Sequence, residues 1–283
     1  MSKTILLNHS NWHFTKENPG IPTAIMGEAI TLPHTWNAVD GQDGGNDYYR
    51  GTCWYTLALT KPAIPAGGKA VLQLDGAAMT AAVYLNGEKL TEHKGGYSTF
   101  RAEVTELLQA ENQLTVRVDN SVNDRVYPQK ADFTFYGGIY RDVSLLVVNK
   151  NHIALGHFGD TGVKITPTLK EGSSDIRVET LVEGSGTVTV ELLDAEGRTA
   201  AKGEGENTFL HLDAPHLWNG IKDPYLYTCV VRLLQDGKPV DEVTTKVGLR
   251  SFSVDAMCAA CPSSCSPSAP VRRKARRDRK SVV

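Results

Sequence analysis

Hydrophobic and polar residues alternate with a period of two along most of this chain. The clearest segments are residues 53–60, 70–76, 81–87, 112–120, 142–148, 187–193 and 227–234. They are short, rich in β-branched and aromatic residues, and end at turn-forming residues, which is typical of β-strands. Helical periodicity covers about two turns at most, at residues 103–112. The pattern therefore predicts an all-β protein.

Three turn sequences predict hairpins between these strands. Asn86-Gly87 separates VYL from EKL, and Asp236-Gly237 separates VRLLQ from KPV. Both dipeptides tolerate the positive φ angles that a type I′ turn requires. Residues 194–197 are expected to form a slightly longer hairpin loop.

The spacing of the predicted strands changes near residue 150. Before that point, the long irregular stretches 27–51 and 121–138 interrupt the strands, as in a jelly-roll sandwich that carries binding loops. After residue 160 the strands repeat about every 8 to 12 residues, which is typical of an immunoglobulin-like sandwich. We therefore expect a jelly-roll β-sandwich over residues 1–150 and an immunoglobulin-like β-sandwich over residues 151–255.

The remaining segment, residues 256–283, has a different composition. It carries seven Lys and Arg against one Asp, or +6, whereas the first 255 residues carry −8, which together give the formal net charge of −2. It also holds Cys258, Cys261 and Cys265, which suggest a thiolate metal site, and a basic run that suggests nucleic-acid binding. We favour a third interpretation, a disordered tail that is translated out of frame and unrelated to the rest of the chain, because the segment lacks a strand pattern and aromatic residues.

Composition indicates the cellular location in which we expect the protein. The sequence has 283 residues, of which 41% are hydrophobic, and no apolar run approaches the roughly 20 residues of a membrane span. The first residues contain no sustained apolar segment of the kind found in signal peptides. Cys53 and Cys229 stand alone within strand-like segments, as expected in a reducing compartment. We therefore expect a cytoplasmic protein with no membrane or nucleic-acid partner.

Motifs for catalysis are absent from the sequence. It contains no GxxxxGK[ST], GxGxxG, HExxH or GxSxG pattern. A glycosidase carboxylate pair is defined by its separation in space, which sequence spacing in a sandwich does not supply. No catalytic residue is assigned.

Two loops of the first domain carry candidate binding residues. Residues 40–51, which include Asn46 and Asp47, combine amide, carboxylate, phenol and guanidinium groups, which suit sugar hydroxyls and the apolar faces of sugar rings. The alternative is an ordinary solvated loop. Asp132 stands among aromatic residues, where an acid needs a salt bridge, hydrogen bonds, a bound cation or contact with water. Arg125 and Arg141 are its candidate salt-bridge partners.

Six segments in register resemble glycoside hydrolase family 2, and within it the bacterial β-galactosidases. They are LPHTWN at 32–37, YYRGTCWY at 48–55, the stretch 74–108, FYGGIYRDVSLL at 135–146, HLWNGIKDPYLYT at 216–228 and VGLRSFSVD at 247–255. The resemblance implies a jelly-roll sugar-binding domain and an immunoglobulin-like domain. In the family, a TIM barrel with two catalytic glutamates follows them and performs retaining hydrolysis.

The family-like sequence ends at Asp255, so the interpretation is an N-terminal β-galactosidase fragment that is inactive without its barrel. The resemblance also implies that Asp132 helps to bind galactose hydroxyls, in some members through sodium. Asn46, or its neighbour Asp47, would touch the same sugar. No cofactor is assigned to this chain, whereas sodium or magnesium is expected in the intact enzyme.

Other readings remain open. The chain could be a freestanding carbohydrate-binding module, or a subunit that complements a separate catalytic chain. The parent enzyme could also resemble a β-glucuronidase or a β-mannosidase. The expected partners are a weakly bound galactose-containing saccharide, the missing barrel, and further copies of the chain in a homo-oligomer.

Overall fold

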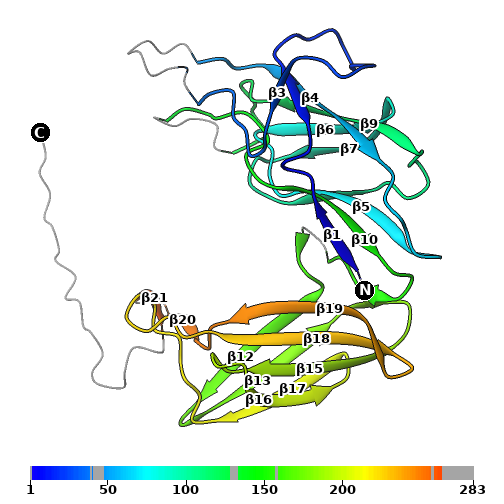
Figure 1. The fold of residues 1–283 in the computed structure, drawn as a ribbon. Helices are drawn as coiled ribbons and strands as arrows, with labels where there is room; N and C mark the ends of the chain where they lie inside the picture. Colours follow the sequence, from blue (N-terminus) through cyan, green and yellow to red (C-terminus); the bar gives the residue numbers. More distant parts are fainter. Residues whose placement is uncertain are drawn as a thin grey trace, which may run out of the picture.

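The chain folds into two β-sandwich domains that are joined end to end (Figure 1). A computed structural model describes residues 2–38, 40, 48–127, 133–156, 159–255 and 258–262. Within these ranges there is no α-helix, which confirms the prediction of an all-β protein. The same ranges contain no helix that is long and apolar enough to cross a membrane.

The first domain packs a six-stranded sheet against a four-stranded sheet. The larger sheet has the order β3-β2-β4-β9-β6-β7, and the smaller has the order β1-β10-β5-β8, with every neighbouring pair antiparallel. The strands are β1 (Lys3–Leu6), β2 (Trp12–Thr15), β3 (Glu28–Ile30), β4 (Thr52–Thr60), β5 (Lys69–Leu74), β6 (Thr80–Leu85), β7 (Glu88–Lys94), β8 (Phe100–Glu103), β9 (Glu111–Asp119) and β10 (Val143–Val148).

Strand β4 shows how alternation builds the core and where one prediction was wrong. Trp54 and Tyr55 were both expected to fill the space between the sheets. Tyr55 does so and is fully buried, but successive side chains of a strand point to opposite faces. Trp54 therefore packs on the outer face of the sheet against Ala82 and Tyr84, and its indole N–H donates to Asn18 Oδ1 at 3.0 Å.

Cys53, beside them, is a core thiol rather than a nucleophile. It is fully buried, and this burial raises the pKa of the Cys53 thiol to about 12. A thiol with that pKa is protonated at neutral pH, and only the thiolate is strongly nucleophilic.

The predicted hairpin turns are confirmed. Asn86 and Gly87 have φ angles of 52° and 85°, and Asp236 and Gly237 have 48° and 74°. Two consecutive positive φ angles are the signature of a type I′ turn, whose twist matches that of the strands it joins. These turns connect β6 to β7 in the first domain and the last two long strands in the second.

The second domain is a smaller sandwich with its own core. One sheet has the order β12-β13-β17 and the other β16-β15-β18-β19, while β11 and β14 form a separate pair. Fully buried aliphatic residues from both sheets, such as Ile176, Leu192 and Leu233, fill the space between them. The strands are β11 (His152–Ile153), β12 (Val163–Lys170), β13 (Ser173–Thr180), β14 (Val182–Glu183), β15 (Thr187–Leu193), β16 (Thr199–Glu204), β17 (Asn207–Asp213), β18 (Tyr227–Gln235) and β19 (Lys238–Val247).

A short hairpin follows the second domain. Strand β20 (Phe252–Asp255) pairs antiparallel with β21 (Cys258–Pro262). Strand β21 falls in the segment that we expected to be disordered, and residues 263–283 lie outside the described residues.

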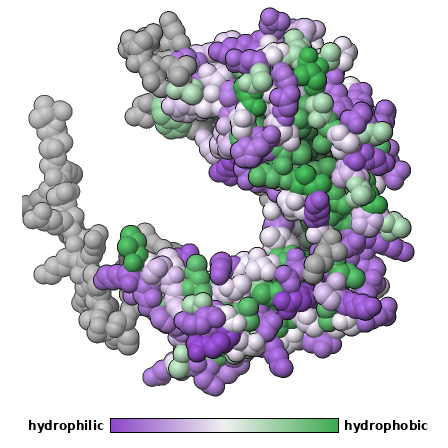
Figure 2. Space-filling model, in the orientation of Figure 1, coloured by the Kyte–Doolittle hydropathy of each residue, from purple (hydrophilic) through white to green (hydrophobic). Residues whose placement is uncertain are grey.

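Polar contacts fasten the two domains to each other, and in the view of Figure 2 the domains border a common hollow. Lys69 Nζ lies 3.1 Å from Glu183 Oε2, and Asn149 Nδ2 donates to the carbonyl of Val240 at 2.8 Å. The Arg101 guanidinium makes two further hydrogen bonds at this junction. Its Nη1 donates to the carbonyl of Gly156 at 2.7 Å and its Nη2 to that of Asp160 at 3.0 Å.

Arg101 is oriented from its own sheet. Its Nε donates to Gln73 Oε1 at 2.7 Å across the β5–β8 pair. Burial lowers the pKa of the Arg101 guanidinium, and the Asp160 and Asp75 carboxylates partly offset that effect. One side chain of the first domain therefore holds the segment that enters the second.

Replacing Arg101 with Ala should loosen this junction. The change removes three hydrogen bonds from a charged donor, so we expect a loss of about 2 kcal/mol of stability and faster amide exchange at residues 154–156. Urea denaturation and hydrogen–deuterium exchange measure these two effects. Arg125→Ala, at an exposed arginine, is the control. Identical exchange in the Arg101 variant and the wild type would contradict the assignment.

Candidate functional site

Three connections of the first domain leave the six-stranded sheet at the same end. Thr52, at the start of β4, pairs with Asp119, at the end of β9, and Asp119 also pairs with Thr80, at the start of β6. The segments before β4, after β9 and before β6 are therefore neighbours, although they are far apart in the sequence. They contain both loops that the sequence marked as candidate binding loops.

Asn120, fully buried at the end of β9, ties these connections together. Its Nδ2 donates to the carbonyl of Phe135 at 2.8 Å and lies 3.3 Å from the carbonyl of Tyr49 and 3.2 Å from Asn37 Oδ1. Its Oδ1 accepts from the backbone N–H of Gly51 at 2.9 Å. A primary amide has both hydrogen-bond donors and an acceptor. It therefore supplies partners for backbone N–H and C=O groups that have no neighbouring strand where the sheet ends.

Asn37 repeats this arrangement from the connection before β4. It is 1% exposed, its Oδ1 accepts from the N–H of Gly137 at 2.8 Å, and its Nδ2 donates to the carbonyl of Tyr49 and to Asp40 Oδ2, both at 3.0 Å. The two asparagines thus join residues 37–40, 49–51 and 135–137 into one unit.

Gly137 and Gly138 bring the third segment close to the first. A Cβ on Gly137 would lie 2.0 Å from Trp36 Cζ2, and one on Gly138 would lie 2.3 Å from the carbonyl oxygen of His34. Gly138 also has a φ of 137°, which L-residues rarely adopt. Both glycines are required for this contact.

The two candidate binding loops meet through their described flanks. The N–H of Phe135 donates to the Tyr48 hydroxyl at 3.3 Å, and the Arg50 guanidinium lies 4.7 Å from the centre of the Phe135 ring. Arg50 Nε is itself held by the carbonyl of Asn120 at 2.9 Å. The described flanks of the two stretches are therefore in direct contact.

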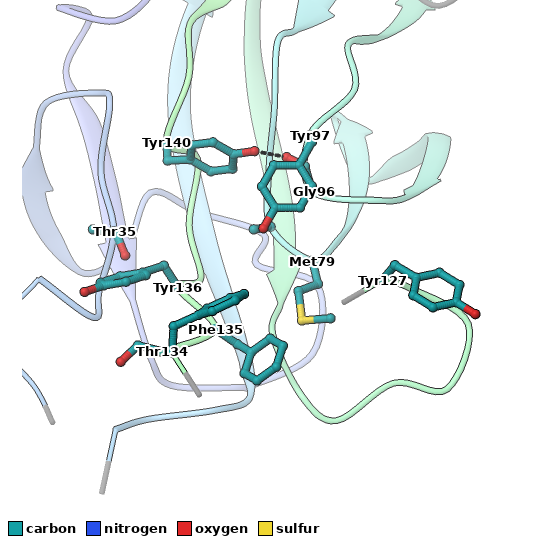
Figure 3. Close-up of a pocket in the computed structure, with 11 residues that line it drawn as sticks. Thr35, Met79, Gly96, Tyr97, Tyr127, Thr134, Phe135, Tyr136 and Tyr140 are labelled. Atoms are coloured by element: carbon teal, nitrogen blue, oxygen red, sulfur yellow. Dashed lines mark hydrogen bonds between the residues drawn. The ribbon is translucent and has the colours of Figure 1, made fainter. Parts of the chain in front are cut away.

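The three connections, together with the one between β7 and β8, line a pocket of about 490 Å³ (Figure 3). Thr35, Ala78, Met79, Gly96 and Thr134 contribute to its wall, and the remaining lining residues are aromatic. The rings are Tyr97, Tyr127, Phe133, Phe135, Tyr136 and Tyr140. This volume lies within the range of small-molecule binding sites.

The described lining of the pocket is mainly uncharged. None of its eleven lining residues is an Asp, Glu, His or Cys, the side chains that serve most often as acids, bases or nucleophiles. Burial raises the pKa of the Tyr140 hydroxyl, which donates to the carbonyl of Gly96. That phenol therefore stays protonated at neutral pH.

The three predicted site residues cannot be placed directly. Asn46, Asp47 and Asp132 lie outside the described residues, and their role in sugar binding stays a prediction. Their sequence neighbours Tyr48 and Phe133 belong to the contacts and the pocket described above.

The described residues also contain no cluster of three or more His, Cys, Asp or Glu side chains that could hold a metal ion. They therefore offer no such ligand cluster for the sodium or magnesium ion expected with Asp132.

Sequence reasoning missed the residues that build the site. Asn37 stands within the LPHTWN segment but had no assigned role, and Asn120 follows a predicted strand directly. An asparagine at the end of a predicted central strand was a usable signal. Tyr97 and Met79 carry no such signal in the sequence, because they come from separate connections that only the fold brings together.

Two family models match the chain. The model of the glycosyl hydrolases family 2 sugar binding domain matches residues 11–149, and that of glycosyl hydrolases family 2 matches residues 157–250. Both sandwich domains therefore match domains of a glycosyl hydrolase family. The chain belongs to glycoside hydrolase family 2.

Individual relatives are similar over most of the chain. A β-glucuronidase of Bacteroides fragilis is 33% identical over 272 residues, which cover 89% of this chain and 38% of the relative. The crystal structure of an FMN-binding β-glucuronidase from Facaelibacterium prausnitzii L2-6 has a TM-score of 0.83 at 34% identity and covers 93% of this chain and 42% of that one.

A putative β-galactosidase from Bacteroides fragilis has a TM-score of 0.79 at 31% identity, over 92% of this chain and 43% of its own. The chain therefore spans about 40% of the length of these relatives.

Gly137→Ala tests the close approach that shapes the site. The new methyl group must displace the buried Trp36 ring, and overpacking of this kind costs about 1–3 kcal/mol. We expect urea denaturation to show a loss of about 2 kcal/mol.

Two further variants separate the steric effect from backbone strain. Gly137 has no positive φ, so its loss should be steric, whereas Gly197→Ala meets no atom within 4 Å at a φ of 80° and gives the cost of backbone strain alone for comparison. Trp36→Phe in the Gly137→Ala background should recover part of the stability. A Gly137→Ala variant as stable as the wild type would show that the ring is not confined there.

Proposed function

We propose that this chain is the substrate-recognition part of a retaining exo-β-glycosidase. The observation that carries the proposal is the aromatic pocket, whose described lining residues include no carboxyl group, on a domain that belongs to family 2. Retaining hydrolysis needs two carboxyl groups about 5–5.5 Å apart, one as acid/base and one as nucleophile. In our proposal those groups come from a catalytic barrel, and the present chain binds and positions the glycoside.

The sugar is the finer part of the proposal. The names of relatives at 33–34% identity support a terminal β-D-glucuronic acid residue, and the guanidinium of Arg50, stacked on a lining ring, would attract an anionic sugar. A terminal β-D-galactose residue is the second candidate. It is supported by the putative β-galactosidase relative and by the amide and carboxylate residues of the first loop.

The polar contacts to the sugar would come from the predicted residues. Asp132 would accept hydrogen bonds from sugar hydroxyls, directly or through a sodium ion, and Asn46 or Asp47 would bind the same ring from the other loop. The described flanks of these loops meet at Tyr48 and Phe135, which supports a shared site.

The setting of this activity is also proposed. The free thiols of Cys53 and Cys229 support a reducing, cytoplasmic location. The catalytic barrel and further copies of the chain are the proposed protein partners.

The purified chain tests this function. We expect no hydrolysis of 4-nitrophenyl β-D-glucuronide or β-D-galactoside, because the proposal places both catalytic carboxyl groups on the barrel and the described lining of the pocket supplies none. Calorimetry with the methyl β-glycosides should give a dissociation constant of about 1 mM or weaker, equivalent to about −4 kcal/mol. Turnover by the pure chain would contradict a recognition role, and so would the absence of binding to either glycoside at 50 mM.

Asp132→Asn tests the proposed sugar contact. Loss of a charged acceptor should weaken binding of the preferred methyl glycoside at least about fivefold. Asp124→Asn is the matched control, because Asp124 is a highly exposed acid eight residues earlier. Equal affinity of the two variants would remove Asp132 from the site.

A further inference from the structure

The sequence contains two Asn-Gly dipeptides, and the fold holds only one of them in place. Asn86-Gly87 forms the turn between β6 and β7, whereas Asn219-Gly220 stands in the connection between β17 and β18. A glycine after an asparagine leaves its backbone nitrogen open to approach, because glycine has no side chain. Attack of that nitrogen on the asparagine side-chain amide is the first step of spontaneous deamidation.

Asn86 is held at every polar atom of its side chain. Its Oδ1 accepts from the backbone N–H of Gln113 at 2.9 Å, and its Nδ2 donates to Asn112 Oδ1 at 3.0 Å. Asn112 is a fixed partner, because it is only 6% exposed and its own Nδ2 donates to the carbonyl of Leu59 at 3.0 Å. The side-chain amide of Asn86 therefore cannot turn toward the nitrogen of Gly87 without breaking two hydrogen bonds.

Asn219 has no comparable support. Its exposed side chain forms no hydrogen bond with any residue that the structure describes, and the same is true of the backbone N–H of Gly220. One bridge closes the loop: the N–H of Asn219 donates to the carbonyl of Asp223 at 2.7 Å, and the return bond is 3.4 Å long. Between these two residues, Ile221 is fully exposed. The two reacting groups of this dipeptide are therefore free to approach each other.

Hydrogen bonding, rather than access to water, separates the two dipeptides. Asn86 and Asn219 are both exposed, so solvent reaches both side chains. The two hydrogen bonds of Asn86 reduce the fraction of molecules in a reactive conformation by roughly tenfold to a hundredfold. No such factor applies to Asn219.

We propose that Asn219 is a site of spontaneous deamidation and isoaspartate formation. The backbone nitrogen of Gly220 forms a bond to Cγ of Asn219, and the side-chain NH₂ group leaves as ammonia with the proton of the Gly220 N–H. Water then opens the resulting succinimide at either carbonyl, which yields aspartate or isoaspartate. Water is the only other reactant.

The product carries a carboxylate on the residue that faces Asp223 across the bridge. Like charges directly opposite each other destabilise such a pair. The Asp223 carboxylate is itself held in place, because its Oδ2 lies 2.7 Å from His216 Nε2. Deamidation should therefore loosen residues 219–223 and make the formal net charge of −2 one unit more negative.

Peptide mapping of the whole chain tests the inference. The folded protein is incubated at mildly alkaline pH, and samples are digested with trypsin, which cleaves after lysine and places the two dipeptides on separate peptides, residues 70–89 and 203–222. Mass spectrometry follows the conversion of each side-chain amide to an acid. We expect Asn219 to convert at least tenfold faster than Asn86. Methylation of peptide 203–222 by a protein isoaspartate methyltransferase should detect the isoaspartate product.

Two controls assign the difference to the fold. In guanidinium chloride the unfolded chain should convert Asn86 and Asn219 at rates within about threefold of each other, because glycine follows both residues. Asn219→Gln should remove the signal from peptide 203–222, since a glutamine must close a larger and less favourable ring.

The Asn219→Asp variant tests the consequence for the loop. Amide exchange at Asp223 should be at least about threefold faster than in the wild type, and high salt should reduce the difference by screening the two carboxylates. Unchanged exchange would overturn the predicted loosening.

The rates in the folded chain decide the assignment. Equal conversion of Asn86 and Asn219 would overturn it, and so would an Asn219 that converts at least tenfold more slowly in the folded chain than in the unfolded one. None of these measurements involves a sugar, so their outcome is independent of the proposed function.

Discussion

The site depends on two buried primary amides at the end of one sheet. Asn120 Nδ2 lies 3.2 Å from Asn37 Oδ1. Together the two side chains form hydrogen bonds with backbone groups of Tyr49, Gly51, Phe135 and Gly137. Without them, the buried N–H of Gly137 would lack a partner, at a cost of about 1–3 kcal/mol, and the partly buried groups of Tyr49, Gly51 and Phe135 would lose theirs. The pocket exists because this network lets irregular backbone pack against a regular sheet.

The sandwich and the junction have different roles around that network. Alternating strands bury Tyr55 and its neighbours and fix which loops emerge together. Arg101 then holds the segment that leads to the second domain. Connections whose described flanks are held in this way keep the aromatic rings that line the pocket in one arrangement.

Local patterns in the sequence predicted the strands and turns, but not the contacts between distant segments. Asn86-Gly87 and Asp236-Gly237 specify their turns through their own φ preferences, so they could be predicted from two residues. Trp54 was assigned to the wrong face because both sides of its sheet are covered, and alternation alone does not show that. The Asn120 contacts depend on the register of β4, β6 and β9, which no local pattern encodes. The resemblance to family 2 predicted the two kinds of domain. The pocket could not be predicted, because its lining residues come from separate connections that only the fold brings together.

Amide hydrogen exchange at Gly51 and Gly137 tests the central claim most directly. Both N–H groups bond to asparagine side chains, to Asn120 Oδ1 at 2.9 Å and to Asn37 Oδ1 at 2.8 Å, rather than to a strand. If the amide network holds the site, nuclear magnetic resonance will show both amides exchanging as slowly as those in the centre of β4. Exchange within about tenfold of the rate in an unstructured peptide would show that these loops are not held, and would contradict the account.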